Sequence, residues 1–188
     1  MTAPTRIETH RLVLRELGDG DFDAVHDYAI DPEVVRFMPW GPNTEADTLD
    51  FLARARAQAT ANPRLGYELA ITRRDDGQLI GAIGLHRETD DSDEAMLGYC
   101  FSRRAWGKGF ATEAGSAMLK FAFEGVGLAS VWAGCDVRNQ GSVRVLEKLG
   151  MSLMSRHTHE PEGDDEGGES FMFRISNEEW TRAAGAPT

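Results

Sequence analysis

The chain has 188 residues, of which 41% are hydrophobic and 27% are charged. This composition suits a globular domain with one core and excludes disordered and fibrous proteins. The 20 Lys and Arg residues against 31 Asp and Glu give a formal net charge of −11, so nucleic acid is not an expected partner. No apolar run reaches the roughly 18 residues that cross a bilayer, and the first residues do not resemble a signal peptide. We therefore expect one cytoplasmic domain over residues 1–188 and no membrane partner.

Cysteine and histidine spacing argues against metal or disulfide chemistry. Cys100 and Cys135 lie in apolar stretches without the spacing of metal ligands, which predicts buried thiols in a reducing compartment. His157 and His159 share a strand face as two ligands would, yet no third ligand is evident. We expect no metal.

Strand and helix patterns alternate in the first half of the chain. Apolar and charged residues at strand period predict a strand over 11–17, and apolar residues at helical spacing predict a helix near 21–30. Thr44 and Asp47 form a capping-box pattern before a helix that extends to about residue 61. Three β-rich runs follow, and their short connections predict an antiparallel meander. These runs cover about 67–73, 78–87 and 94–101.

The second half continues the mixture of helices and strands. Apolar residues on one face predict a helix from 109 to about 124, which ends at Gly125 or Gly127. The other expected elements are a strand over 131–137, a helix over about 140–149, and strands near 151–159 and 169–175. This order predicts a mixed α/β layer, because strands and helices do not alternate strictly.

The most informative stretch runs from Arg104 to Glu113, where a predicted strand gives way to a helix. Gly107 and Gly109 lie one residue apart in this segment. Such glycines let consecutive backbone amides converge on an anion, the helix start adds partial positive charge, and Lys108 can add more. The segment therefore predicts a pyrophosphate site, although an ordinary glycine-bearing loop before a helix fits the same spacing.

Two other phosphate-binding motifs are excluded by direct reading. The Walker pattern GxxxxGK[ST] fails because Phe110 follows the second glycine, and the dinucleotide pattern GxGxxG fails at Thr112. A nucleotide hydrolase or an NAD-dependent enzyme therefore has no basis in this segment.

The segment Arg104-x-x-Gly107-x-Gly109 resembles the acetyl-CoA signature of the GNAT acetyltransferases. Further segments match in order and resemble the branch typified by ribosomal-protein N-terminal acetyltransferases, over roughly residues 7–175. They are Arg11-Leu-x-Leu-Arg15, the Trp40 segment, Ala70-Ile71 through Leu85, Leu97-Gly-Tyr99, Gly107 to Ala114, and Asn139-Gln-Gly-Ser142 leading to Glu147-Lys-Leu-Gly-Met151.

The resemblance implies a mixed, mostly antiparallel sheet with flanking helices, in which two parallel strands splay apart and acetyl-CoA bridges the gap. It implies that Phe101 offers backbone groups to the pantetheine amides, that residues 105–112 hold the pyrophosphate, and that Asn139 and Ser142 contact the pantetheine or the thioester. Asn139 as a plain helix cap and Ser142 as a passive first-turn residue remain open. The expected cofactor-binding residues are Phe101, Arg104, Trp106, Gly107, Lys108, Gly109, Phe110, Ala111, Thr112, Asn139 and Ser142.

Two departures from the family pattern bear on catalysis. Met96 stands where much of this branch has a glutamate, the usual candidate base. Leu146 stands where many members of the superfamily have a tyrosine that protonates the leaving thiolate. Ser142 is the nearest replacement for that tyrosine.

Glu94 and His86 are the remaining candidates for the base. Glu94 lies two residues before Met96 and shares its strand face, and His86 lies near the end of the preceding strand. Either can reach the substrate amine, directly or through water. The alternatives are a solvated charge at a strand end and a satisfied strand histidine. Glu113 is a weaker candidate, because the helix dipole alone explains an acid in the first turn.

Two further segments have alternative interpretations. Phe37 and Trp40, in a segment broken by prolines, either cover the acceptor site or pack on the sheet. The acidic loop 160–169 is either a solvated hairpin tip or a lip that attracts a cationic amine.

Together these features predict an acetyl-CoA-dependent N-acetyltransferase in which a primary amine attacks the bound thioester directly in a ternary complex. An α-amine or another amine of low pKa is favoured as acceptor, on a peptide or protein N-terminus or a small molecule. A ping-pong route is disfavoured because neither cysteine has a recognisable histidine partner. A homodimer is compatible with the sequence. The competing hypothesis, prompted by the missing Glu and Tyr, is a non-catalytic acyl-CoA-binding or sensing module.

Overall fold

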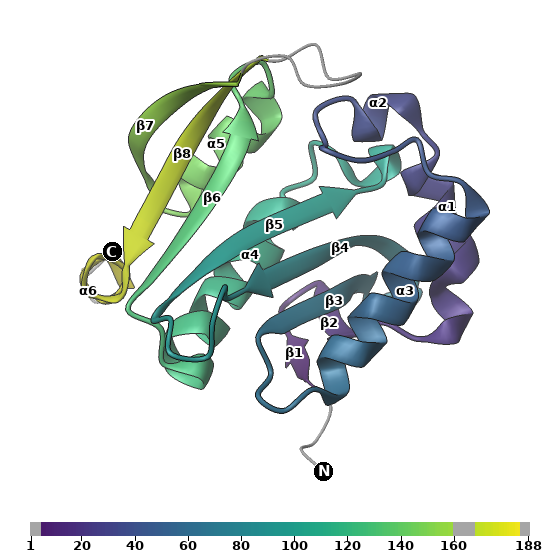
Figure 1. The fold of residues 1–188 in the computed structure, drawn as a ribbon, viewed down its shortest axis with the longest axis horizontal. Coiled ribbons are helices and arrows are strands. Elements are labelled where there is room, and N and C mark those ends of the chain that lie inside the picture. Colours follow the sequence, from purple (N-terminus) through teal and green to yellow (C-terminus); the bar gives the residue numbers. More distant parts are fainter. Residues whose placement is uncertain (1–4, 160–167, 185–188) are drawn as a thin grey trace.

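A mixed sheet forms the centre of the protein, whose computed structural model describes residues 5–159 and 168–184. Within these ranges eight strands pair in the order β1-β2-β3-β4-β5-β6-β8-β7 (Figure 1). Every neighbouring pair is antiparallel except β5 and β6, which are parallel. The strands are β1 (Arg6–Glu8), β2 (Leu12–Glu16), β3 (Gly66–Arg73), β4 (Leu79–His86), β5 (Glu94–Phe101), β6 (Ser130–Asp136), β7 (Ser152–His159) and β8 (Gly168–Ser176). The predicted sheet, with its one parallel pair, is confirmed.

Helices cover both faces of this sheet. In Figure 1, α1 and α3 lie in front of the strands β2–β4 and α4 lies behind the sheet, while α5 lies beside β6. The helices are α1 (Phe22–Ala29), α2 (Pro32–Val35), α3 (Glu45–Thr60), α4 (Phe110–Lys120), α5 (Gln140–Lys148) and α6 (Asn177–Ala184). After α4 the chain continues through a π-helical segment, Phe121–Val126. No helix in the described ranges combines the length and the apolar character needed to cross a membrane.

Most predicted elements are present, and the three that were not predicted are short. They are β1, α2 and α6, each of eight residues or fewer. The capping box before α3 is confirmed, since Thr44 Oγ1 accepts from Asp47 N–H at 3.2 Å and Asp47 Oδ2 accepts from Thr44 N–H at 2.8 Å. The predicted helix over 109–124 is α-helical only to Lys120.

The core is divided by the sheet into two layers. Leu69, Ala70 and Ile71 follow one another on β3 and are all fully buried, because Ala70 faces the layer under α1 and α3 while Leu69 and Ile71 face the layer under α4. A strand covered on both faces reads as a continuous apolar run rather than an alternating one. This double coverage explains the apolar run in the sequence.

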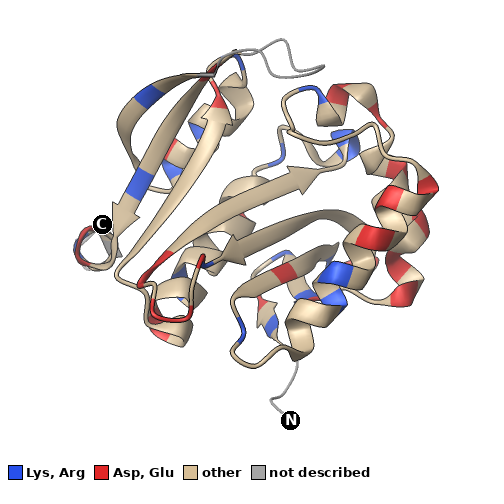
Figure 2. Cartoon of the chain, in the orientation of Figure 1, with Lys and Arg blue, Asp and Glu red and all other residues tan. Residues whose placement is uncertain are grey.

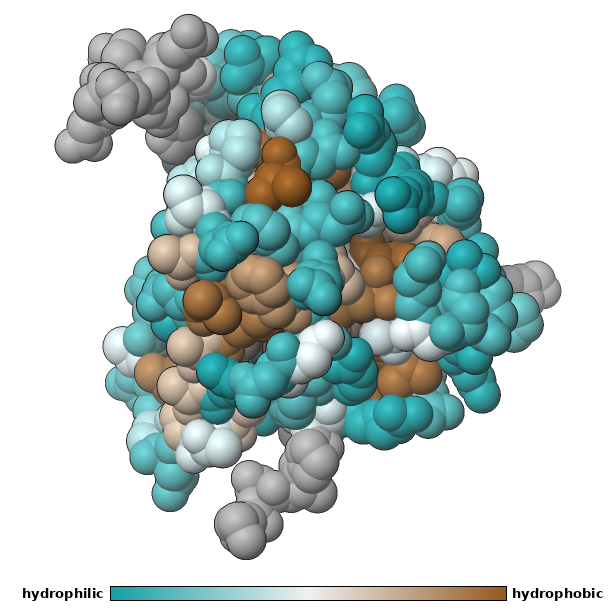
Figure 3. All heavy atoms as spheres, turned by 90° about the vertical axis from the view of Figure 1, so that its right-hand side faces the viewer, coloured by the Kyte–Doolittle hydropathy of each residue, from teal (hydrophilic) through white to brown (hydrophobic). Residues whose placement is uncertain are grey.

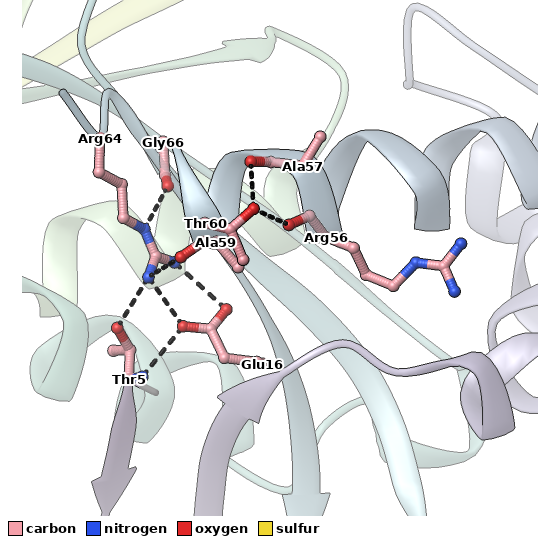
Figure 4. Close-up of polar contacts among 8 residues, drawn as sticks. All are labelled: Thr5, Glu16, Arg56, Ala57, Ala59, Thr60, Arg64 and Gly66. Carbon is pink, nitrogen blue, oxygen red and sulfur yellow. Dashed lines mark hydrogen bonds and ion pairs between the residues drawn. The ribbon is translucent and has the colours of Figure 1, made fainter. Parts of the chain in front are cut away.

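Arg64 ties three parts of the chain together at the start of β3 (Figure 4). Its guanidinium donates to both carboxylate oxygens of Glu16, at 2.9 and 3.2 Å, and to the carbonyl of Gly66 at 2.9 Å. Glu16 also accepts from the Thr5 N–H at 3.0 Å. The charged hydrogen bonds, which are stronger than neutral ones, fix the position of Gly66.

The parallel strands β5 and β6 pair only at their beginnings. Their register runs from Glu94 opposite Ser130 to Met96 opposite Trp132. Beyond Met96, β5 stays paired with β4 as far as Phe101, and β6 stays paired with β8 as far as Asp136. Each strand is therefore held by its outer neighbour, and the two splay apart beyond this point.

Candidate active site

Two cavities meet where β5 and β6 splay. The α3-side cavity, of about 850 Å³, lies between the sheet and the helices α1 and α3. The α4-side cavity, of about 600 Å³, lies between the loop before α4 and the helix α5. Both volumes are typical of small-molecule sites. The two cavities share Phe37, Met38, Tyr99, Cys100, Asn139 and Ser142, so they adjoin at the splay.

The loop before α4 presents backbone to the α4-side cavity. Gly107 and Gly109 have φ values of 72° and 77°, a left-handed conformation that other residues rarely adopt. A Cβ at Gly107 would meet no atom within 4 Å, so the backbone conformation, not space, requires glycine there. No side chain caps the first turn of α4, and its start, with residues 110–112, lines the cavity. The amides of this turn are therefore available to an anion.

Side-chain charge in the α4-side cavity is opposite to that of the whole protein. The lining contains four cationic side chains and one carboxylate, although the chain carries −11 overall. Acidic residues gather instead along α1 and α3 and in the turn between β4 and β5 (Figure 2). The cavity therefore suits a polyanion. The cations are Arg36, Arg138, Arg144 and Lys148, and the carboxylate is Glu33.

Two of the expected cofactor residues do not line this cavity. Arg104 and Lys108 are exposed and absent from its lining. The carbonyl of Lys108 instead accepts from Arg11 Nη1 at 2.9 Å. The Arg11 guanidinium also lies 4.6 Å from the centre of the Phe110 ring. Arg11 therefore contacts the loop at both Lys108 and Phe110.

Glu113 has a structural role at the start of α4. Its carboxylate accepts from Thr9 Oγ1 at 2.6 Å, from Arg11 N–H at 2.8 Å and from Arg11 Nε at 2.6 Å. Burial alone would raise the pKa of Glu113, but these hydrogen bonds and the charge of Arg11 outweigh it and lower that pKa. Glu113 therefore anchors the first hairpin to α4.

Backbone groups of β5 point into the splay. The N–H of Ser102 donates to the carbonyl of Ile80 on β4 at 2.9 Å. Successive residues in a strand direct their backbone groups to alternate sides, so Tyr99 and Phe101 direct theirs toward the splay. The Phe101 carbonyl already accepts from Trp106 Nε1 at 2.9 Å. This strand thus offers a ligand both backbone groups of Tyr99 and the Phe101 N–H, which also interacts with the Cys100 thiol.

Asn139 and Ser142 lie at the junction of the two cavities. Asn139 caps α5, because its side-chain oxygen accepts from the Ser142 N–H at 3.1 Å, and both residues also line both cavities. The Ser142 hydroxyl lies 2.9 Å from the Tyr99 hydroxyl. Burial raises the pKa of Tyr99 to about 12, against a smaller lowering by Ser142, so Tyr99 stays protonated near neutral pH. The sequence does not predict a role for the Tyr99 hydroxyl, because only the fold places it beside Ser142.

The two cysteines line the α3-side cavity without becoming nucleophiles. Burial, with a contribution from Glu68, raises the pKa of the Cys100 thiol to about 12. Burial also raises the pKa of Cys135, and the hydrogen bond with Ser142 only partly offsets it. Because the thiolate is the reactive form, neither environment activates a cysteine.

His86 and Glu68 form a hydrogen-bonded pair in the wall of the α3-side cavity. His86 Nε2 and Glu68 Oε2 lie 2.9 Å apart, and both residues line the cavity. Since a carboxylate only accepts, Nε2 donates this hydrogen bond, and in the neutral form of the imidazole Nδ1 is then the acceptor nitrogen. A Cβ at Gly84 would lie 2.4 Å from His86 Nε2, and one at Gly66 would lie 2.9 Å from Nδ1. Gly84 therefore makes room for the imidazole, and Gly66 makes room both for it and for Gln58, whose Oε1 would lie 2.6 Å from the same Cβ.

Glu94 lies outside the lining of the α3-side cavity and pairs with an arginine of β8. Its carboxylate accepts from Arg174 Nη2 at 3.1 Å, and the same nitrogen donates to Ser130 Oγ at 2.9 Å. Met96 lines the cavity, whereas Glu94 does not. Sequence alone does not predict this ion pair, because Arg174 reaches Glu94 from β8, across β6.

The remaining candidates are partly placed by the structure. Phe37 lines both cavities and Trp40 lines the α3-side cavity. Residues 160–167 of the acidic loop lie outside the described residues. Among the residues described, no group of three His, Cys, Asp or Glu side chains is arranged to hold a metal ion.

Comparison with known proteins agrees with this geometry. The family model "Acetyltransferase (GNAT) domain" matches residues 11–152. The uncharacterized N-acetyltransferase YnaD of Bacillus subtilis (strain 168) is 28% identical over 174 residues, covering 93% of this chain and 98% of its own. The crystal structure of a GNAT-family acetyltransferase from Bacillus anthracis superimposes with a TM-score of 0.82 at 28% identity, covering 93% of this chain and 99% of that one.

A third structure shares the fold at lower identity. Mycobacterium smegmatis RimJ, solved in complex with CoA-disulfide, has a TM-score of 0.79 and 21% identity, covering 97% of this chain and 93% of that one. The match of the family model covers most of the chain, and the sheet and its splay are those that the family resemblance implied. The protein belongs to the GNAT acetyltransferase family and is an acyltransferase that acts on an amine.

Proposed function

We propose that the protein transfers an acetyl group from acetyl-CoA to a primary amine by direct attack in a ternary complex. The observation that carries this proposal is the meeting of two cavities of different character at the splay of β5 and β6. The donor enters from the α4 side and the amine from the α3 side. The thioester then lies at the junction, beside Tyr99, Asn139 and Ser142.

The α4-side cavity fits the polyanionic donor in two ways. The glycine loop and the uncapped start of α4 offer main-chain amides to the pyrophosphate, and the cationic lining complements its charge. The backbone groups of Tyr99 and Phe101 are the partners for the pantetheine amides. Acetyl-CoA supplies an activated carbonyl carbon, to which the amine nitrogen bonds as the C–S bond breaks and CoA leaves as a thiol.

Tyr99 and Ser142 supply the proton for the departing sulfur. Their hydroxyls form a short donor chain of 2.9 Å at the junction, and Tyr99 stays protonated because burial raises its pKa to about 12. These hydroxyls take the place of the family tyrosine that Leu146 replaces. The thiols of Cys100 and Cys135 stay protonated, so no covalent enzyme intermediate forms.

His86 receives the proton that the amine releases, and Glu68 positions it. In the neutral form of the imidazole Nδ1 is the acceptor nitrogen, and His86 lines the cavity that the amine enters. The sequence left Glu94 and His86 as candidates for the base, and Ser142 as the replacement for the family tyrosine. We assign the base to His86, through water, because Arg174 holds Glu94 outside the cavity lining.

A water-relayed base favours an amine that is already partly neutral. An α-amine with a pKa of about 8 is roughly one-tenth neutral at pH 7, while a lysine side chain near 10.4 is neutral about once in 2,500. These fractions differ by about 3 kcal/mol in the free energy needed for deprotonation. We therefore propose an α-amine or another amine of lowered pKa as the acceptor.

Thiol release with acetyl-CoA and a panel of amines tests this function. Peptides that carry both a free N-terminus and an internal lysine are expected to be modified at the N-terminus, and blocking that N-terminus is expected to abolish the release. Efficient modification of internal lysines despite a blocked N-terminus would contradict the proposed amine class. Binding of acetyl-CoA without thiol release for any amine would instead support a sensing module.

The setting of the enzyme follows the same proposal. We place one acetyltransferase domain over residues 1–188, with its core at about 7–175, in the cytoplasm, where its thiols stay reduced. Analytical ultracentrifugation tests whether it works as a monomer or as a homodimer.

A further inference from the structure

The α3-side cavity is walled mainly by apolar and aromatic side chains. They come from α1, from the segment between α2 and α3, from α3 itself, and from β5 and β6. Met96 and Trp40 are among the most exposed large apolar side chains of the described protein, at 36% and 37%. The side chains that matter below are Tyr28, Phe37, Trp40, Phe51, Met96 and Trp132.

The carboxylates of this cavity already have partners. Each of the four that line it accepts a hydrogen bond or forms an ion pair with a neighbouring residue. Only Asp50 and Asp136 have an arginine as partner, so the cavity keeps some negative charge, which suits an amine. The pairs are Asp47 with Thr44, Asp50 with Arg54, Glu68 with His86, and Asp136 with Arg138.

The floor of the cavity consists of small residues, and of these Gly84 is covered by the side chains of His86 and Glu68. Ala82, Gly84, Gly98 and Gly134 line it, and a Cβ added at Gly98 would meet no atom within 4 Å. The space above Gly98 is therefore open. Apolar side chains also gather in the middle of the face that carries α1 and α3, within a hydrophilic surround (Figure 3). Room and apolar walls thus occur together next to the junction with the α4-side cavity.

We propose that the acceptor is an amine whose carbon bears a bulky apolar group, aromatic or branched aliphatic. This inference rests on the proposed acetyl transfer and names the substrate class of that site. The amine lies at the junction near Ser142, and the apolar group fills the space above Gly98, against Met96 and Trp132 on one side and Phe37 and Trp40 on the other. Burial of such a group from water drives binding. A free amino-acid derivative and a peptide N-terminus share this chemistry.

Matched amines test the proposal. We would measure kcat/KM by thiol release at pH 9, where α-amines are mostly neutral, for glycinamide, phenylalaninamide, Gly-Gly-Gly, Phe-Gly-Gly and spermidine. Phenylalaninamide is expected to exceed glycinamide by about 10- to 100-fold, the usual value of burying a large apolar group. A larger phenylalanine-to-glycine ratio of kcat/KM for the amides would indicate a free amino-acid derivative as the acceptor. A larger ratio for the tripeptides would indicate a peptide N-terminus.

The outcomes separate this inference from the proposed function. Turnover of glycinamide or spermidine at least as fast as that of phenylalaninamide would overturn the substrate class and leave acetyl transfer intact. Absence of thiol release with every amine would contradict the proposed function itself.

Two methionines provide a matched pair of variants. Met96→Gln places a polar group of similar size in the cavity wall and is expected to lower the phenylalaninamide-to-glycinamide ratio about tenfold. Met154→Gln changes a 59% exposed methionine of β7 that does not line the cavity, and the ratio is expected to stay the same. Equal ratios in the two variants would count against the proposal.

Filling the open space provides an independent variant. Gly98→Leu is expected to lower kcat/KM for phenylalaninamide at least tenfold more than for glycinamide, because its side chain takes the space of the apolar group. The Kd for acetyl-CoA, measured by titration calorimetry, is expected to stay within about threefold for Met96→Gln and Gly98→Leu. An equal loss for both amines in Gly98→Leu would contradict the assigned position of the apolar group.

Discussion

His86 on β4 lies directly opposite Met96 on β5 in the antiparallel register. Opposite residues share a face of the sheet, with Cβ atoms about 5 Å apart. An imidazole therefore lies next to the position where the family resemblance expects a carboxylate. Glu68 lies on β3, the other neighbour of β4, and its Oε2 is 2.9 Å from Nε2 of His86. In the proposed mechanism the group that takes up the proton therefore lies on β4 instead of β5.

His86→Gln is expected to lower kcat/KM at least about tenfold, because general-base groups contribute 10²–10⁴-fold when direct and less when relayed by water. The ascending limb of the pH profile is expected to shift or disappear. Glu68→Gln keeps the imidazole but weakens its orientation, so a smaller loss and an unchanged KM for acetyl-CoA are expected. Glu94→Gln is the control. A pH profile that changes in Glu94→Gln and not in His86→Gln would reverse the assignment.

Gly109→Val is expected to weaken acetyl-CoA binding at least tenfold. Valine is strained at a φ of 77°, and its side chain disturbs the amides at the start of α4. Lys108→Ala is expected to change the Kd less than threefold, because Lys108 does not line the cavity. Isothermal titration calorimetry measures both values. Similar losses would mean that side-chain charge, not main chain, holds the donor.

Asn139→Ala is expected to impair turnover more than folding. Loss of a helix cap costs about 1 kcal/mol of stability, while a misplaced thioester costs about a hundredfold in rate. Ser176→Ala serves as a matched control, because the Ser176 hydroxyl accepts from the Glu179 N–H at 3.2 Å and lies away from both cavities. Urea unfolding and kcat are measured for both variants. Equal stability losses with normal kcat in both would make Asn139 purely structural.

Glu113→Gln is expected to destabilise the protein by about 1–2 kcal/mol at pH 7, because charged hydrogen bonds to Thr9 and Arg11 are weakened. The folded-state pKa of Glu113 is lowered, so its contribution is present above the unfolded pKa near 4.3 and is lost as pH falls through the folded value. The difference between wild type and variant, measured by urea unfolding, is therefore expected to shrink below about pH 4.

Glu124→Gln is the control for that experiment. Its carboxylate is exposed and lies 3.8 Å from Lys120, and exposed pairs contribute about 0–1 kcal/mol. If the loss of unfolding free energy in Glu113→Gln stays constant down to pH 3, the charge of Glu113 does not explain its contribution to stability.

Local pattern predicts most of the secondary structure. Apolar periodicity, the capping box of Thr44 and Asp47, and glycines at helix and strand ends are signals contained within a few residues. The short elements β1, α2 and α6 are not predicted, because they have too few residues to show a repeat of apolar positions. The π-helical character of the chain beyond Lys120 is also not predicted, because the apolar residues still follow a helical pattern there.

The candidate site was predicted unevenly for a related reason. Gly107 and Gly109 are recognisable because the backbone conformation they permit is a local property. Nothing in the local pattern assigns a role in the site to Glu68 or Tyr99. A charged residue inside the otherwise apolar β3, where both faces are covered, is the signal that could have identified Glu68, because a buried charge needs a partner.

The sequence by itself determined most of the helices and strands, the glycine loop before α4 and the family resemblance, since each depends on residues close together in the chain. Tertiary structure alone decided which side chains meet. Register across β3, β4 and β5 places Glu68, His86 and Met96 in one wall, and Arg174 removes Glu94 from it. The splay also exists only in three dimensions, because β5 and β6 are each held by an outer neighbour. Pairing between distant strands has no local signal, so the chemistry of the wall becomes visible only when the sheet is assembled.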